Sequence, residues 1–182
     1  IGGEIPQHIL NGRMDKAEES VLWFKNLFGE DYYLEIQRHE THDPNAAQDV
    51  YPHQVTANKA ILELARKHNI KVIATNDVHF VNAEDAEAHD RLICLSTGKD
   101  LDDPNRMRYT KQEWMKTTAE MNTIFSDIPE ALSNTLEIAD KVEFYSIDHG
   151  PIMPTFAIPE DFGTEEEYRQ KFTEQDLFDE FT

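Results

Sequence analysis

The sequence predicts an α/β fold built around a pair of parallel strands. Two short segments, 32–39 and 71–76, have the β-branched and aromatic composition of strands. Between them, the segment 54–68 carries apolar residues at helical spacing. A helix of this length can return the chain to the same end of a sheet, so the two strands should run parallel.

Further helices are expected on both sides of this unit. Asp15 and Glu18 have the spacing of a capping box, and the helix that they begin should end at Gly29. Downstream of the second strand, helices are expected over 83–96, 117–125 and 127–141, with a short one after Thr110 that contains Trp114 and Met115. Residues 110–142 should therefore form a small helical extension.

The composition is that of a globular protein with no membrane span. Of the 182 residues, 39% are hydrophobic, and no apolar run reaches the ~18 residues that a transmembrane helix needs. Lys and Arg number 17 against 36 Asp and Glu, a net charge of −19, so the chain should not bind duplex nucleic acid by itself. The single cysteine, Cys94, cannot form an internal disulfide, which is typical of the reducing cytoplasm.

Both ends of the chain suggest a fragment of a longer protein. The sequence begins at Ile1 without an initiator Met or a signal peptide. After Val142 it becomes irregular and proline-containing, and residues 159–182 form an acidic stretch with interleaved aromatic residues. We expect a linker followed by a solvated acidic tail.

Asp77 and His79 are the strongest candidates for chemistry. They directly follow the second predicted strand, and functional groups in parallel α/β folds lie at the carboxyl ends of strands. In an extended chain residues 77 and 79 point to the same side. A carboxylate and an imidazole placed in this way suit Zn, Mn or Fe. Two ligands alone do not hold a metal, and Asp77 could instead be a turn or helix-cap residue.

The first strand offers two more candidates. Alternation places Glu35, Gln37 and His39 on one face, from which Glu35 and His39 could point toward the same cavity as Asp77. Glu35 is interpreted either as a residue that hydrogen-bonds to the metal ligands without binding the metal, or as a buried acid paired with a base. His39 is interpreted as a possible direct ligand. His89 is interpreted as a hydrogen-bonded core histidine, and Cys94 as a small apolar residue.

Several motifs occur in a characteristic order along the chain. They are Gly2-Gly3-Glu4-Ile5-Pro6-Gln7, Tyr33-Leu34-Glu35-Ile36-Gln37, Val72-Ile73-Ala74-Thr75-Asn76-Asp77-Val78-His79-Phe80, Ala88-His89-Asp90, Leu101-Asp102-Asp103-Pro104, and Phe125-x-Asp127-Ile128-Pro129-Glu130-Ala131-Leu132-x-Asn134-Thr135. Together, from the first residue to about Lys141, they resemble the alpha subunits of bacterial DNA polymerase III. The similar region is the C-terminal half of the N-terminal polymerase-and-histidinol-phosphatase (PHP) domain of those subunits.

The resemblance implies a fold and a metal site. Residues 1–109 would form the C-terminal part of a distorted, TIM-like parallel βα barrel, 110–142 its helical extension, and 143–182 a linker and acidic tail toward the polymerase palm. The Asp-x-His motif of the family matches Asp77 and His79. The other metal ligands and the catalytic carboxylates of the polymerase would lie outside this chain. An incomplete barrel exposes apolar edges, so the fragment could self-associate.

The resemblance also implies a function, with alternatives. The parent chain would be a replicative DNA-directed DNA polymerase whose partners are DNA, an exonuclease subunit and the sliding clamp. Its intact PHP domain would use Zn, Mn or Mg for phosphoester hydrolysis, such as 3′–5′ proofreading, or would be a vestigial scaffold. A small-molecule phosphatase of the same barrel type and a non-catalytic interaction module are the alternatives. The fragment alone should not polymerise, and it should bind metal weakly or not at all.

Overall fold

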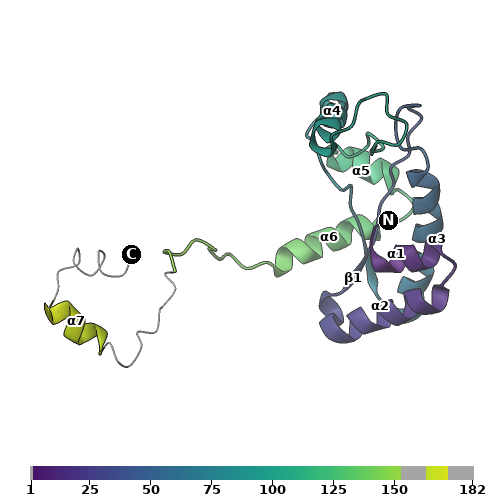
Figure 1. The fold of residues 1–182 in the computed structure, drawn as a ribbon. Helices are drawn as coiled ribbons and strands as arrows, with labels where there is room; N and C mark the ends of the chain where they lie inside the picture. Colours follow the sequence, from purple (N-terminus) through teal and green to yellow (C-terminus); the bar gives the residue numbers. More distant parts are fainter. Residues whose placement is uncertain (1, 153–162, 172–182) are drawn as a thin grey trace. The chain divides into compact units, whose positions relative to one another are not determined.

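A parallel pair of strands forms the sheet of the computed structural model, which describes residues 2–152 and 163–171. β1 (Tyr33–Ile36) pairs residue by residue with β2 (Lys71–Ala74). The chain crosses between them through α3 (Val50–His68) (Figure 1). The predicted α/β class and the parallel pairing are confirmed. Within the described residues the sheet has two strands and does not close, so an incomplete barrel is not confirmed.

The chain divides into two units, Ile1–Glu143 and Phe144–Thr182. The sheet and the helices from α1 to α6 belong to the first unit, and α7 (Glu165–Lys171) belongs to the second. Most of the predicted acidic tail, including 172–182, lies outside the described residues. No helix in the described ranges has the length and apolarity to span a membrane.

Helices surround the sheet and supply most of the core. α1 (Glu4–Leu10) packs on α2 (Met14–Phe28) and α3, while α6 (Glu130–Lys141) packs against β2. Alternate strand residues are buried, as a strand with one covered face requires. The core joins these strand residues to the helices; its members include Ile5, Val21, Leu34, Ile36, Ile61, Leu64, Val72, Ala74, Phe125 and Ala131.

The remaining helices of the first unit follow capping signals in the sequence. The carboxylate of Asp85 accepts the backbone N–H of Asn82 at 2.9 Å in the turn that leads into α4 (Ala86–Thr97). The Thr117 hydroxyl accepts the Glu120 N–H at 3.3 Å where α5 (Thr118–Ile124) begins. A side-chain acceptor at this position satisfies a helix N–H that would otherwise lack a partner. These two helices therefore begin within a few residues of their predicted positions.

The predicted helix containing Trp114 and Met115 is wrong. This segment is extended, and a parallel β-bridge joins Trp114 to Phe80. Lys111 has a φ of +64°, a left-handed conformation that does not continue into a right-handed helix. The backbone groups of the segment bond to the chain that follows β2, and this distant pairing replaces the local hydrogen bonds of a helix.

Candidate functional site

Asp77 and His79 lie in a turn just beyond the carboxyl end of β2. Asp77 has a φ of +46°, so the chain is not extended there as the spacing argument assumed. The turn nevertheless brings Asp77 Oδ1 and His79 Nδ1 to 4.0 Å, with side chains 54% and 31% exposed. His79 Nδ1 also lies 2.6 Å from the carbonyl oxygen of Asp77. Since a carbonyl can only accept, Nδ1 carries the proton and the lone pair of Nε2 stays available to a ligand.

Residues 110–115, here called the clamp segment, hold this turn in place. The His79 N–H donates to the Glu113 carbonyl at 2.8 Å, and the Met115 N–H donates to the Phe80 carbonyl at 3.1 Å. The side-chain amide of Asn76 donates to the carbonyls of Gln112 at 2.9 Å and Trp114 at 2.7 Å. The position of Asp77 and His79 therefore depends on a part of the chain more than thirty residues downstream.

His39 is buried between the two strand ends, with both ring nitrogens engaged. Its backbone N–H donates to Gln54 Oε1 at 2.7 Å, so the amide nitrogen of Gln54 faces His39 Nδ1 at 3.2 Å as a donor. His39 Nε2 lies 3.2 Å from the Asn76 carbonyl and donates to it. The contact at Nδ1 requires the neutral imidazole, because a protonated ring has no lone pair with which to accept the Gln54 amide hydrogen. As placed, His39 offers no lone pair to a metal and instead links β1, α3 and the turn before Asp77.

Stability should depend on pH through His39. Burial lowers the pKa of His39, and the carboxylate of Glu113, 3.7 Å from Nδ1, opposes this shift. The unfolded chain therefore takes up a proton at a higher pH than the folded chain, and stability is lost as the pH falls below about 6.5. We expect the free energy of unfolding to fall by up to ~1.4 kcal/mol per pH unit from this group. Urea titrations at pH 7 and pH 5 should show a smaller drop in His39→Gln; an equal drop would exclude His39 as the source.

Glu35 is exposed on the side of β1 that does not face the core. It accepts a hydrogen bond from the Thr75 hydroxyl, and the Gln37 amide donates to Thr75 Oγ1 at 3.1 Å. These contacts link the two strands next to the turn, but they do not include Asp77 or His79. Glu35 is thus neither buried nor paired with a base, and its role as a ligand stays a prediction.

A buried carboxylate completes the surroundings of the site. Glu113 Oε1 accepts hydrogen bonds from the backbone N–H and the hydroxyl of Thr110, at 3.1 and 2.5 Å. Its other oxygen, Oε2, is buried without a hydrogen-bond partner. These bonds fix the conformation of the clamp segment from within, so that its backbone can hold the turn at His79.

Asp77 and His79 fit part of a metal site. They offer one carboxylate and one free imidazole nitrogen, donors that suit Zn or Mn. Within the described ranges, no three His, Cys, Asp or Glu side chains are grouped closely enough to hold a metal ion. A complete ligand set therefore requires donors beyond the residues described.

The sequence is similar to that of one subunit of a bacterial DNA polymerase. DNA polymerase III subunit alpha of Borreliella burgdorferi is 40% identical over 179 residues, which cover 97% of this chain and 15% of the relative. The same subunit of Treponema pallidum is 31% identical over 100% of this chain and 15% of the relative, and that of Pseudomonas aeruginosa is 37% identical over 92% and 14%. The chain therefore matches one segment of the DNA polymerase III alpha subunit in each of these three bacteria. It spans about 15% of the length of the first two of these relatives, and no protein-family model matches it.

The ring of His79 packs against two aromatic neighbours. Its centre lies 4.7 Å from that of Tyr109 and 5.5 Å from that of His89 on α4. His89 is half-buried and packs 5.1 Å from Phe80. The sequence placed His89 in the core, whereas the structure places it beside the candidate ligand.

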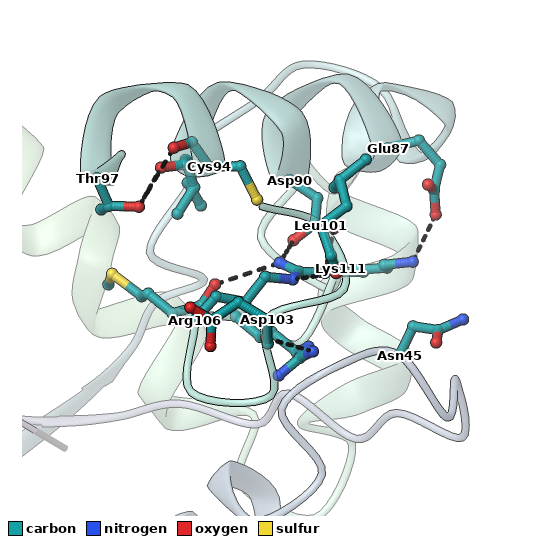
Figure 2. A network of polar contacts seen from close by, with 12 residues as sticks. Asn45, Glu87, Asp90, Cys94, Thr97, Leu101, Asp103, Arg106 and Lys111 are labelled. Atoms are coloured by element: carbon teal, nitrogen blue, oxygen red, sulfur yellow. Dashed lines mark hydrogen bonds and ion pairs between the residues drawn. The ribbon is translucent and has the colours of Figure 1, made fainter. Parts of the chain in front are cut away.

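A polar network holds the loop that carries Tyr109 (Figure 2). The guanidinium of Arg106 forms two parallel hydrogen bonds to Asp90 of α4, at 2.6 and 2.7 Å, and its Nε donates to the Leu101 carbonyl at 2.9 Å. Lys111 contacts both Glu87 of α4 and Asp43, the latter at 2.8 Å. These contacts hold the chain between α4 and the clamp segment in place. They therefore support Tyr109 and His89, which pack beside His79.

Sequence reasoning missed the residues that position the site. Gln54, Asn76 and Glu113 are polar and buried, and their partners are distant along the chain. The only available signal was local: Gln54 lies on the helix face that also carries Ala57 and Ile61, where a polar residue needs a buried partner.

Proposed function

We propose that this chain supplies the Asp-x-His ligand pair of a PHP-type, metal-dependent phosphoesterase site in a DNA polymerase III alpha subunit. The main support is the position of Asp77 and His79 at the carboxyl end of a parallel strand, with an exposed carboxylate and a free imidazole nitrogen. The two-stranded sheet would then be one part of an incomplete βα barrel, completed by the parent chain.

The residues of this chain would bind and orient rather than complete the reaction. Asp77 and His79 would hold a divalent ion (Zn, Mn or Mg), which when bound neutralises charge on a phosphoester and activates water. The clamp segment fixes the backbone of His79, and the side-chain amide of Asn76 binds carbonyls of the same segment. His39 stays neutral and joins the strand ends beneath them.

The whole protein would be a DNA-directed DNA polymerase that acts in replication in the cytoplasm. Its partners would be DNA and other replisome subunits, including an exonuclease subunit and the sliding clamp. No polymerisation chemistry is assigned to residues 1–182. Because this sequence has a net charge of −19, basic groups from elsewhere in the parent chain would be needed to hold DNA.

A non-catalytic scaffold is the second candidate. The lack of a third ligand near Asp77 and His79 among the described residues favours it. Elemental analysis of the full-length protein separates the two functions, because a scaffold without a metal site would purify without a stoichiometric divalent ion.

Asp77→Asn in the full-length protein should abolish metal-dependent phosphodiester hydrolysis, with a loss of at least ~100-fold. The substitution keeps the shape of the side chain but removes the charge that attracts a cation. Hydrolysis of a 3′-labelled oligonucleotide with added Mn, together with the metal content of the protein, measures the effect. Asp102→Asn, an exposed acid with the same charge change, should leave hydrolysis unchanged. Wild-type hydrolysis in Asp77→Asn would remove Asp77 from the ligand pair and contradict the proposal.

A further inference from the structure

Lys116 is a half-buried cation that forms no ion pair with a carboxylate of the described residues. It directly follows the clamp segment, and its Nζ donates to the Gln112 carbonyl and lies 3.4 Å from the centre of the Trp114 ring. Within the described part of the chain, no carboxylate oxygen lies within 4.0 Å of this Nζ. Six other lysines form such ion pairs: Lys16, Lys67, Lys71, Lys99, Lys111 and Lys141.

The charge of Lys116 is costly where it stands. Burial lowers the pKa of Lys116 to about 8, although Glu113 and Glu120 favour the charged form from a distance. The chain has 36 acids and a net charge of −19, yet none of the described carboxylates forms an ion pair with this ammonium. An anion bound to Lys116 would supply the charge pairing that no carboxylate among the described residues provides.

A groove of about 440 Å³ opens beside Lys116. Its walls are Ala74 at the end of β2 and residues of α5 and α6, the helices that follow the clamp segment. Thr118, Asn122 and Ser133 line it with hydroxyl and amide groups, and Leu132 contributes apolar surface. This volume lies in the range of small-molecule sites, which combine an apolar wall with a few polar groups.

The groove lies at the same end of the sheet as the candidate ligands. The Gln112 carbonyl accepts both the Lys116 ammonium and the side-chain amide of Asn76, and Asn76 directly precedes Asp77. In parallel α/β folds, ligands bind just beyond the carboxyl ends of the strands. A ligand held by Lys116 would therefore lie next to the turn that carries Asp77 and His79.

We propose that Lys116 and this groove bind the phosphoryl group of a nucleotide. A lysine ammonium is a compact charge that binds phosphate, the Thr118 hydroxyl and the Asn122 amide can donate to its oxygens, and the apolar wall suits a base or sugar. This inference rests on the proposed function, because it names the substrate class of the same site. It adds a binding residue, Lys116, that is separate from the ligand pair.

Competitive acetylation of the full-length protein tests the site directly. The protein is treated with trace acetic anhydride at pH 8, with divalent metals chelated, and the lysines are read by peptide mass spectrometry. A rise of one unit in the pKa of Lys116 lowers its neutral fraction at this pH about fivefold. Deoxyadenosine monophosphate should thus reduce acetylation of Lys116 about fivefold or more, while exposed Lys59 on α3 is unaffected. Equal acetylation of Lys116 with and without the nucleotide would overturn the proposal.

Substitutions give a second, independent measurement. By calorimetry, Lys116→Met should weaken binding of deoxyadenosine monophosphate at least ~10-fold, and Lys116→Arg should largely preserve it. Lys59→Met is the matched control for the loss of one positive charge. Inorganic phosphate should compete with the nucleotide, and deoxyadenosine without phosphate should not bind. Binding by deoxyadenosine alone, or wild-type affinity in Lys116→Met, would contradict a phosphoryl site.

The two proposals can fail separately. Protection of Lys116 in a protein whose Asp77→Asn variant still hydrolyses DNA would retain the nucleotide site and reject the ligand pair. Loss of hydrolysis in Asp77→Asn without any protection of Lys116 would reject only the nucleotide site. If Lys116→Met does not fold, the acetylation of the wild-type protein still shows whether the nucleotide binds at Lys116.

Discussion

Arg106→Met should lower the free energy of unfolding by about 3–5 kcal/mol. The side chain of Arg106 is 4% exposed and that of Asp90 is 12% exposed, and two short hydrogen bonds join them. Methionine fills much of the same volume but leaves the carboxylate of Asp90 without a partner. The cost comes mainly from that uncompensated charge, together with the loss of the bond from Arg106 Nε to the Leu101 carbonyl. Urea unfolding followed by circular dichroism measures the change.

Two further variants identify the cause of this loss. Arg108→Met changes a neighbouring arginine whose bonds to the Pro104 and Asp103 carbonyls are long, at 3.3 Å, so it should cost less than ~1 kcal/mol. Adding Asp90→Asn to Arg106→Met removes the unpaired charge and should recover part of the stability. If the double variant were less stable than Arg106→Met alone, an unpaired carboxylate could not be the reason for the loss.

The strand pairing was predictable because its signals are local. The segments 32–39 and 71–76 differ in composition from the helix between them, and a connection of this length permits a parallel arrangement. The structure trims the strands to four residues each and starts α3 at Val50, four residues before the expected start. Both differences concern ends of elements, where local propensity is weak.

The clamp segment was not predictable, because its partners are distant. Trp114 and Met115 were assigned to a helix on local grounds, but the Met115 N–H donates to the carbonyls of Phe80 and Val81, and the Trp114 carbonyl accepts the side-chain amide of Asn76. The same reason explains the buried face of α3. Hydrophobicity alone would place Val55 on the buried face of α3, yet Val55 is 52% exposed, whereas the polar Gln54 is buried. Gln54 is buried because His39 needs a donor and an acceptor there, which no helical pattern reveals.

The pairing of Asp77 with His79 was predictable from spacing, although the assumed backbone was not. Two residues placed two apart come together both in an extended chain and in this left-handed turn. His39 was harder to interpret, because alternation along β1 stops at Ile36. Beyond that point the His39 side chain turns into the interior rather than toward Asp77 and His79. The prediction that His39 shares a face with Glu35 and Gln37 therefore failed.

Asn76→Asp should be more destabilising than Asn76→Ala, although aspartate matches the shape of asparagine. Asn76 is 7% exposed, and both hydrogens of its amide donate to carbonyls of the clamp segment. Alanine leaves the Gln112 and Trp114 carbonyls without this donor, at a cost of about 1–3 kcal/mol. Aspartate places a buried carboxylate against the same two oxygens, and the cost should rise to about 3–5 kcal/mol at pH 7.

Acid should partly rescue Asn76→Asp, because protonation of the new carboxyl restores one donor toward the clamp segment. Urea unfolding at pH 7 and pH 5 should therefore show a gap between Asn76→Asp and Asn76→Ala that narrows at the lower pH. Asn26→Asp, on the exposed face of α2, controls for the added charge and should change stability by less than ~0.5 kcal/mol. Equal stability of the Asp and Ala variants at pH 7 would mean that the amide donors do not hold the clamp segment. The turn at Asp77 would then depend only on the backbone bonds from His79 and Met115, and the side-chain amide of Asn76 would not be needed to hold it.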